Sequence, residues 1–323
     1  MSDRALQTED YPITFSGLVL NDNKSTAGVR DVTKDKSCYE VLSFDPSRLQ
    51  YRDQKEGLHL ISGGDLGAAT RVFRYLSLVG IIRDTTPALL ADREARLRRA
   101  FDIEEAQYTS PTTVGQQALD FYTPTAVAPS GFSSSSPVHE LYLCRPSVYP
   151  QAYDRVNQGL QESFAIELVC ADPTRYMYAA STATANSGDS FSVAVPNWDA
   201  TSGAMTWPVL RLNLAAGSHA STVNLRFTPT TYGSVVNLVL DLSNAAFTGS
   251  HTVDIDMRTR VILLDGAINS LSRVLTGGTQ VAWARTSAID TYWGIPANGG
   301  TFAITAGTSN LTSGVLSYRQ ARA

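Results

Sequence analysis

The sequence predicts a mainly β protein with two domains, and three features of the chain support this. Its 323 residues exceed what a single hydrophobic core usually holds. Short runs of alternating apolar and polar residues, which are typical of strands, recur along most of the chain. The charge also changes sharply. Residues 1–175 carry 18 Lys and Arg against 23 Asp and Glu, whereas residues 176–323 carry 8 Arg and 7 Asp with no Lys or Glu.

The first half of the chain begins with strands. Ile13–Leu20 and Tyr39–Phe44 are short strand candidates, separated by turn-rich and charged sequence. Arg74–Arg83 is a stronger candidate, because it is rich in β-branched and aromatic residues. Gly80 within it is expected to mark a β-bulge.

A single helix is predicted over Pro87–Asp102. Thr86 is a typical N-cap residue, and proline suits the first helical position that follows it. Leu90, Leu97 and Phe101 recur at helical spacing and form a narrow apolar stripe. We expect this stripe to pack on the neighbouring strands.

The boundary between the domains is expected just after a strand that ends on proline. Residues 108–137, rich in Ser, Thr, Pro and Gly, are expected to form a long loop before strands resume at His139–Cys144 and Phe164–Cys170. The last of these strands runs into Asp172-Pro173, where proline cannot donate to a sheet ladder and disfavours helix in the residue before it. The predicted domains are therefore residues 1–175 and 176–323.

The second half of the chain reads almost entirely as β-structure. Gly, Asn, Ser or Pro separates most of the apolar runs, as in an antiparallel sandwich. Turns are expected at Thr276–Thr279 and Asn298–Gly300. The expected strands are Ser190–Val195, Val209–Asn213, Thr222–Phe227, Val235–Leu240, Thr252–Asp256, Arg260–Leu264, Val281–Ala284, Gly300–Thr305 and Gly314–Tyr318.

The sequence shows no motif for catalysis, cofactor binding or metal binding. It contains no P-loop, G-x-S-x-G, H-E-x-x-H or cysteine–histidine zinc spacing, and its four histidines are scattered singly. The three cysteines are widely spaced, which suggests free thiols in a protein made in a reducing cytoplasm. The net charge of −4 does not favour nucleic-acid binding. No apolar run could span a membrane, and the N-terminus is too polar for a signal peptide.

Three groups of residues are nevertheless candidates for a site. Asp254 and Asp256 point to one face of a strand and could form a metal site or an acid–base pair, although the alternation with apolar neighbours favours a solvated face. The tryptophans could stack on sugars, although in a sandwich they more often belong to the core. On the predicted helix, arginines lie beside acidic residues, which favours a solvated or inter-subunit face over phosphate binding. The four tryptophans are Trp198, Trp207, Trp283 and Trp293, and the helix arginines are Arg93, Arg96 and Arg99.

The order of these segments resembles the distal tail proteins, and the related minor tail proteins, of bacteriophages with long, flexible, non-contractile tails. In the first domain the similar segments are ITFSGLVLND, CYEVLSFDP, RYLSLVGIIRD, PALLADREARLRRAF and FAIELVCADPTRY. In the second they are TWPVLRLNL, VDIDMRTRVILLDG and WGIPANGGTFAITA. Nearly the whole chain is covered, and the order and spacing of the segments carry the resemblance. The loop at 108–137 is longer than in the family, and the last loop has Pro-Ala-Asn in place of Pro-Gly.

The resemblance implies both a fold and a role. The first domain would have the tail-tube fold, a β-sandwich or barrel with one packed helix, and the second would be a galectin-like sandwich of the jelly-roll type. The protein would be a structural component of the virion, made in the host cytoplasm and located at the distal end of the tail. A hexameric ring would join the tail tube and tape-measure protein to the baseplate hub and tail fibres. DNA would pass through its lumen without being read, and Arg93, Arg96 and Arg99 would contact neighbouring subunits.

Several alternatives stay open at the level of the sequence. The second domain could be a carbohydrate-binding module that attaches the particle to a host surface. The chain could instead belong to a domesticated phage-like particle, in which its role would be equivalent. A hydrolase that uses Asp254 and Asp256 is a further alternative, and it is the one that the residue pattern supports least.

Overall fold

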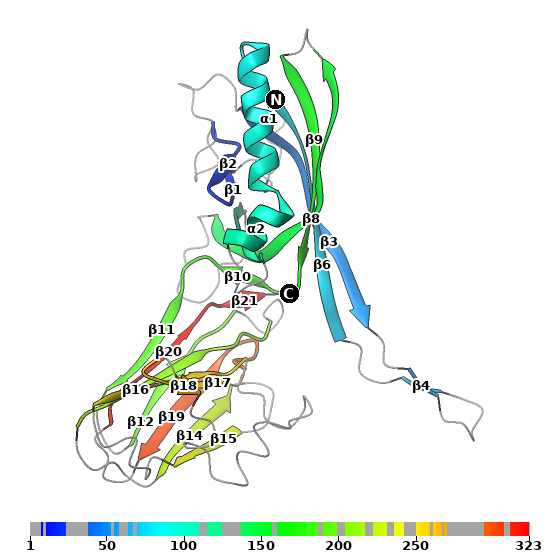
Figure 1. Ribbon diagram of the computed structural model, residues 1–323. Helices are drawn as coiled ribbons and strands as arrows, with labels where there is room; N and C mark the ends of the chain where they lie inside the picture. The colour runs from blue at the N-terminus through cyan, green and yellow to red at the C-terminus, as the bar shows by residue number, and fades with distance from the viewer. Residues whose placement is uncertain are drawn as a thin grey trace. The chain divides into compact units, whose positions relative to one another are not determined.

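The structure is a computed structural model of the chain (Figure 1). It describes residues 8, 11–23, 38–52, 55–57, 64–66, 70–109, 115–124, 137–156, 160–186, 190–198, 204–216, 222–230, 236–241, 250–258, 261–266, 268–269, 294–306 and 311–322. The chain divides into two compact units, one made of residues 1–128 with 133–178 and the other of residues 129–132 with 179–323. Each unit is described separately.

The first unit is built around one long antiparallel sheet. Its strand order is β2-β1-β7-β8-β9-β6-β3, with β10 paired to β8 as well. The strands are β1 (Ile13–Phe15), β2 (Leu18–Leu20), β3 (Tyr39–Arg52), β6 (Thr70–Arg83), β7 (Gln117–Thr123), β8 (Val138–Val156), β9 (Gln161–Cys170) and β10 (Arg175–Met177). A separate two-stranded ribbon consists of β4 (Lys55–Gly57) and β5 (Gly64–Leu66).

Strand β8 changes partner along its length. Residues 138–144 pair with β7, whereas residues 145–156 pair with β9. The sheet therefore has two parts that share this strand. In the second part, β8, β9, β6 and β3 lie side by side, and each is antiparallel to the next.

The predicted helix is confirmed as α1 (Pro87–Ala100), with Thr86 as its N-cap. The Thr86 hydroxyl accepts a hydrogen bond from the Leu89 amide at 3.3 Å, which satisfies one of the unpaired donors of the first turn. Leu90 and Leu97 are buried, as the apolar stripe predicts. Figure 1 shows α1 running along the sheet of the first unit.

A second helix, α2 (Ile103–Thr109), was not expected. The Asp102 carboxylate accepts hydrogen bonds from the amides of Glu104 and Glu105 and so caps its first turn. The signal was present in the sequence as Asp102-Ile-Glu-Glu105, an acidic residue following an N-cap at the spacing of a capping box. The expectation of only one helix was wrong at this point.

The core of the first unit is aromatic where the helix meets the sheet. Phe101, the C-cap of α1, has 0% exposure and stacks on Phe15 of β1 with ring centroids 4.7 Å apart. Phe121 of β7 lies 5.2 Å from Phe44 and 5.4 Å from Tyr142, measured between ring centroids. The inner face of the sheet is thus filled by side chains from α1 and from the strands of both parts.

Several strand predictions in the first half differ from the structure, and β8 continues to Val156, beyond its predicted end at Cys144. Ile13–Leu20 is a hairpin, because Ser16 and Gly17 have φ of 49° and 77° and turn the chain between β1 and β2. The expected loop at 108–137 contains β7, whose buried Leu119 and Phe121 alternate with polar residues inside a Ser/Thr/Pro-rich context. Strand β3 continues to Arg52, beyond its predicted end at Phe44.

Pro46 does not end β3, because of where it sits in the sheet. Proline is tolerated in edge strands and at bulges, where no ladder hydrogen bond is needed from its nitrogen. β3 is the last strand in the order of the sheet, and its register with β6 shifts between Asp45 and Arg48. The proline therefore lies at an irregular position of an edge strand.

Gly80 has a packing role in addition to its place beside a bulge. The register with β3 shifts between Val41 and Ser43, opposite Gly80 and Val79. A Cβ atom at Gly80 would lie 2.3 Å from the Glu40 carbonyl oxygen and 2.4 Å from the Phe164 ring. The glycine lets β3 and the phenyl ring of β9 approach the same point.

The second unit is a sandwich of two antiparallel sheets, as the sequence predicts. One sheet has the order β11-β20-β13-β16-β17-β18 and the other β12-β19-β14-β15. The strands are β11 (Ser181–Asn186), β12 (Ser190–Val195), β13 (Val209–Leu214), β14 (Thr222–Pro229), β15 (Val236–Asp241), β16 (His251–Asp256), β17 (Val261–Leu264), β18 (Ile268–Asn269), β19 (Gly300–Ala306) and β20 (Leu311–Tyr318). The short strand β21 (Ala321–Arg322) belongs to neither of these two sheets. β11 was not anticipated, and the predicted strand at Val281–Ala284 lies outside the described residues.

The predicted turn at Asn298–Gly300 is present, and its glycines are needed. Asn298 and Gly299 have φ of 68° and 73°, which is the left-handed region. A Cβ atom at Gly299 would lie 2.2 Å from the Val195 carbonyl oxygen. The predicted turn at Thr276–Thr279 lies outside the described residues.

Truncating Phe101 to alanine should destabilise the first unit by about 3–5 kcal/mol, because the ring is fully buried against Phe15. Leu89→Ala is the matched control on the same helix, since Leu89 is 46% exposed and should cost less than about 1 kcal/mol. Denaturant unfolding of both variants measures the difference. Equal losses would mean that α1 does not pack through its apolar stripe.

Residues 176–323 should fold when they are expressed alone. All buried residues of the second hydrophobic core lie between Ala183 and Tyr318, so this core needs no side chain from the first unit. A single cooperative thermal transition, followed by circular dichroism, is the expected result. A fragment that unfolds without cooperativity would refute the domain boundary that we predict from the sequence.

Candidate functional site

The part of the sheet formed by β8, β9, β6 and β3 has one covered face and one bare face. Along β9 the residues from Glu162 to Cys170 alternate, so that Phe164, Ile166 and Leu168 are buried and the residues between them are partly exposed. The buried set packs in the core that α1 joins. No described element of the first unit covers the opposite face, and this face is the main candidate for contacts with other proteins.

Large apolar side chains lie on or beside the bare face. Leu42 of β3 is 55% exposed, Val79 of β6 is 41% exposed, and Phe73 of β6 is 37% exposed. Leu42 lies in the bulge of the edge strand β3, next to Ser43, whose partner on β6 is Val79. Exposed apolar residues that cluster in this way are typical of protein interfaces.

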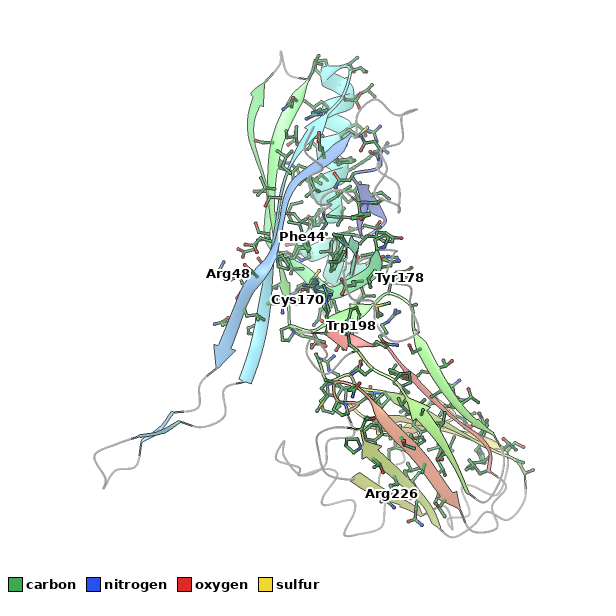
Figure 2. All side chains as sticks on the ribbon, turned by 180° about the vertical axis from the view of Figure 1, so that it is seen from behind. Phe44, Arg48, Cys170, Tyr178, Trp198 and Arg226 are labelled. Carbon is green, nitrogen blue, oxygen red and sulfur yellow. The ribbon has the colours of Figure 1, made fainter. Side chains whose placement is uncertain are left out.

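A polar cluster lies between these apolar residues. The Arg48 guanidinium lies 4.8 Å from the centroid of the Tyr75 ring and 3.3 Å from the Glu167 carboxylate. The Ser147 hydroxyl donates to the same carboxylate at 2.8 Å. Arg48 is labelled in Figure 2, on the outside of the strands. With 70% of its side chain exposed, Arg48 is accessible to a partner.

A small groove opens at one end of the same sheet. Its volume is about 180 Å³, which is below the roughly 300–1,000 Å³ of small-molecule sites. A cofactor would not fit within it, whereas a single side chain of another protein would. The groove is lined by Phe73, Gln116, Arg145, Val169 and Ala171.

The two outer strands of this four-stranded part have unpaired edges. No strand in the described part of the chain pairs with β3 on the side away from β6, or with residues 145–156 of β8 on the side away from β9. At the start of β3, Asn21 takes the place of a partner strand. Its side-chain oxygen accepts a hydrogen bond from the Val41 backbone amide at 2.7 Å, and its own backbone amide donates to the Tyr39 carbonyl at 2.7 Å. Beyond Val41, no described strand pairs with this edge of β3.

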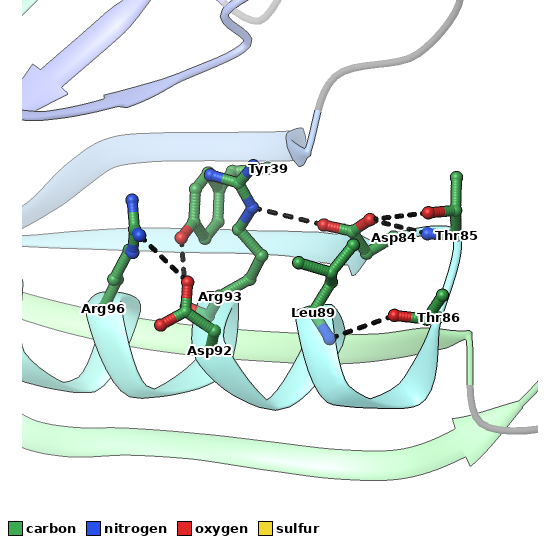
Figure 3. A network of polar contacts seen from close by, with 8 residues as sticks. All are labelled: Tyr39, Asp84, Thr85, Thr86, Leu89, Asp92, Arg93 and Arg96. Carbon is green, nitrogen blue, oxygen red and sulfur yellow. Dashed lines mark hydrogen bonds and ion pairs between the residues drawn. The ribbon is translucent and has the colours of Figure 1, made fainter.

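The helix arginines that the sequence singles out are each paired within the chain, and Figure 3 shows the pairs of Arg93 and Arg96. Arg93 lies 3.3 Å from Asp84, and Arg96 lies 3.0 Å from Asp92. Arg99 lies 3.2 Å from Glu105 of α2. Arg96 and Arg99 are nevertheless 61% and 79% exposed, so these two remain open to a partner, whereas Arg93 is more enclosed.

Arg93 and Asp84 help to fix the start of the helix to the sheet. The Thr85 amide donates to Asp84 at 2.6 Å, and this hydrogen bond, helped by that from Arg93, lowers the pKa of Asp84 against the opposing effect of burial. The Tyr39 hydroxyl of β3 donates to the Arg93 carbonyl at 3.0 Å. Arg93 thus has a structural role inside the unit.

The exit from β9 through Asp172-Pro173 is held by a buried arginine of β6. Arg74 is 5% exposed, and its guanidinium donates to the carbonyl of Pro173 at 2.8 Å and to the carbonyl of Pro46 at 2.7 Å. The Asp172 carboxylate accepts from the Thr174 amide at 3.1 Å and from the Tyr176 hydroxyl. Sequence reasoning identified the Asp-Pro exit and missed the arginine that holds it.

A second buried arginine follows directly. Arg175 donates to the Tyr142 hydroxyl at 3.1 Å and lies 3.5 Å from Glu140, whose side chain is fully buried. Burial raises the pKa of Tyr142, which stays a neutral hydroxyl. Breaking a buried ion pair of this kind costs about 3–5 kcal/mol, so the exit segment is strongly fixed to β8.

The paired aspartates of the second unit each have a partner within the chain. Asp254 receives two hydrogen bonds from Arg211, at 2.7 and 2.9 Å, from the directly opposite position of β13. Asp256 accepts from the Arg258 amide at 2.8 Å. Val253 and the alternate residues after it are buried, as the predicted alternation requires. The carboxylates therefore occupy the outer face of a strand, where one is held in an ion pair.

The tryptophans do not form a common surface in the described residues. Trp198 is 1% exposed, with the Arg322 guanidinium 5.1 Å from its ring centroid, so it offers no face to a sugar. Trp207 is half-buried. Trp283 and Trp293 lie outside the described residues. The burial of Trp198 agrees with the core position that the sequence favours for the tryptophans of a sandwich.

Within the described residues, no group of three or more His, Cys, Asp or Glu side chains could hold a metal ion. None of the described helices is long and apolar enough to cross a membrane.

The cysteines are free thiols, with Cys144 and Cys170 buried and Cys38 half-buried. This agrees with the state expected from their spacing.

Comparison with known proteins identifies the fold. No protein-family model matches the sequence, and no curated protein matches it. Among solved structures, the Dit protein of phage SPP1, described as a paradigm of the hub adsorption apparatus in phages that infect Gram-positive bacteria, matches with a TM-score of 0.56 and 14% identity. The match covers 97% of this chain and 99% of that one.

Two structures of the phage p2 baseplate in its activated conformation, with Ca and with Sr, match with TM-scores of 0.43 and 0.44. Both have 10% identity and cover 96% of this chain and 97% of the other. The match to the SPP1 protein confirms that the chain has the fold of a phage distal tail protein, as the order of its sequence segments predicts.

Replacing Arg74 by methionine should lower the free energy of unfolding by about 2–4 kcal/mol, because two proline carbonyls then lose their charged donor. Arg48→Met is the matched control from the same sheet. Its ion pair is largely exposed, so it should cost less than about 1 kcal/mol. Urea unfolding compares the two, and equal costs would show that the arginine does not hold the exit from β9.

Proposed function

We propose that the protein is a non-enzymatic structural component of a phage tail tip, where it forms a ring that joins the tail tube to the host-binding hub. The observation that carries the proposal is the sheet of the first unit, in which no described element of that unit covers one face and no described strand pairs with the outer sides of β3 and of residues 145–156 of β8. A sheet of this kind is completed by copies of itself. The likeness of fold to the SPP1 protein over nearly the whole chain supports this role.

The strand directions allow the ring to close by continuing the sheet. β8, β9, β6 and β3 are four strands that alternate in direction, so β3 and β8 run opposite to each other. When β3 of one copy lies beside residues 145–156 of β8 of the next, the new pair is again antiparallel. The same contact, repeated between two different edges, generates a closed ring without leaving a free strand.

Prolines limit where main-chain pairing occurs at this seam. Pro46 interrupts the free edge of β3, and Pro146 and Pro150 interrupt that of β8, which protects a single copy from uncontrolled edge pairing. Proline-free backbone remains in Leu42–Asp45 and in residues 151–156. Both segments lie at one level of the sheet, because Gln151, Ala165, Val79 and Ser43 are successive partners across it.

Side chains would add to this pairing. Leu42 of the edge strand β3 is 55% exposed, and Val79 of β6, the partner of the adjacent Ser43, is 41% exposed. Burying both against the next copy would stabilise the ring by the hydrophobic effect.

The ring would lie between the tail tube and tape-measure protein on one side and the hub and fibres on the other. DNA would pass through its lumen, which suits a first half with a net charge of 18 − 23 = −5.

Leu42→Lys should prevent ring formation while the chain still folds. A charged residue at an exposed edge opposes pairing, and the side chain is already more than half exposed in one copy. Val209→Lys is the matched control, since Val209 is 39% exposed and belongs to a strand of the second unit, β13. Mass photometry of the purified full chain should show rings for the wild type and the control, and single copies for Leu42→Lys.

A wild-type chain that stays monomeric at all concentrations and also fails to enter tails would refute the ring. Rings of Leu42→Lys as stable as those of the wild type would leave the ring intact and exclude the proposed seam.

The exposed arginines of α1 are a second proposed contact, with a neighbouring subunit or the adjacent tail ring. Reversing Arg96 and Arg99 together to glutamate should spare folding, because both side chains are mostly exposed, but should weaken assembly by replacing attraction with repulsion. Electron microscopy of particles assembled with the variant measures this. Full-length tails with a normal distal ring would remove α1 from the interface, and unfolded protein would show that this face packs internally.

A further inference from the structure

Cys144 and Cys170 face each other across β8 and β9. The register pairs Arg145 of β8 with Val169 of β9, so one step further along the two antiparallel strands the cysteines are directly opposite. Opposite residues in an antiparallel pair project to the same face of the sheet. Both cysteines have 0% exposure and belong to the core of the first unit. Figure 2 labels Cys170 at the inner end of its strand.

The positions satisfy the geometric requirement for a disulfide bond. Directly opposite residues of antiparallel strands have Cα atoms about 4.5–5.5 Å apart, and the Cα atoms of a disulfide lie about 4.4–6.8 Å apart. The two thiols already interact with each other, and burial followed by this interaction raises the pKa of Cys144. The Cys144 thiol is therefore protonated and unreactive while it stays buried, which keeps the pair reduced in a reducing compartment.

We propose that Cys144 and Cys170 form a cross-strand disulfide once the folded protein meets a two-electron thiol oxidant. In the reaction with a small disulfide, one cysteine loses its proton and attacks, which releases one small thiol and leaves a mixed disulfide. The second cysteine then loses its proton and displaces the other small thiol. The protein loses two protons and two electrons, and the oxidant is reduced to two thiols. A brief local opening of the sheet admits the oxidant.

The bond would lie where β8 changes its partner from β7 to β9, which is the junction of the two parts of the sheet. Cys144 is the last residue of β8 that pairs with β7, and the next residue begins the pairing with β9. Cys170 ends β9 directly before the exit segment that Arg74 holds. A cross-link here would keep β8 and β9 together at their junction. Only its timing rests on the proposed function, because a virion protein is made in a reducing cytoplasm and then acts outside the cell.

The test uses the full-length chain, purified with reducing agent and then incubated with oxidised glutathione under native conditions. Intact mass spectrometry should show the loss of two hydrogen atoms, and peptide mapping should place the bond between Cys144 and Cys170. Cys38→Ser should behave as the wild type, whereas Cys144→Ala and Cys170→Ala should not lose the two hydrogens. The Tm of the oxidised wild type should rise by roughly 5–10 °C, because the cross-link restricts the unfolded chain.

Several results would overturn the inference. The chain could keep three free thiols both in the native state and after refolding with the oxidant. The bond could instead involve Cys38, or its closure could lower the Tm, which would show that the native strands do not accommodate it. These outcomes are independent of ring formation. Rings without a disulfide would refute only this inference, and a disulfide in a chain that forms no rings would refute only the proposed function.

Discussion

The structure of the first unit depends on the unequal burial of the two faces of one sheet. In β9, Phe164, Ile166 and Leu168 enter the core, and no described element covers the residues that alternate with them. Helix α1 and the strands β1, β2 and β7 are already used on the inner face. Within the first unit no further described segment covers the other face, and this is the face that we propose other copies of the chain contact. The two unpaired edges follow from the same arrangement, because a sheet without a closing strand must end somewhere.

The backbone around the prolines leaves carbonyl groups without a strand partner, and Arg74 supplies hydrogen-bond donors for two of them. A proline in an edge strand prevents wrong pairing, but the irregular backbone around it leaves carbonyl groups that no strand satisfies. Arg74 donates to the carbonyls of both Pro46 and Pro173, so one buried side chain fixes the irregular edge of β3 and the exit from β9. The Asp-Pro step is thus both the end of a strand and an anchor, and the ion pair of Arg175 with Glu140 secures the chain directly after it.

Much of this fold could be predicted from local sequence signals. The helix has a cap, a proline and an apolar stripe that agree with one another, and β9 and the sandwich strands alternate cleanly. β7 and the extension of β3 could not be found in this way. The first lies among Ser, Thr and Pro residues, and the second passes through Pro46, which only its place at the sheet edge permits. The candidate interface could not be predicted from the sequence either. Leu42 has the pattern of an ordinary strand residue, and only the strand order shows that it lies exposed on an edge strand. The helix arginines stand out in the sequence because of their charge, and the structure shows that each is paired within the chain.

The central claim is that the bare sheet is completed by copies of the same chain, and a cryo-electron microscopy structure of the assembled protein tests it most directly. Our account predicts a closed ring in which Leu42–Asp45 of β3 lies antiparallel to residues 151–156 of β8 from the next copy, with Leu42 buried at the contact. An assembly in which both of these edges face solvent, or in which copies meet only through the second unit, would contradict it.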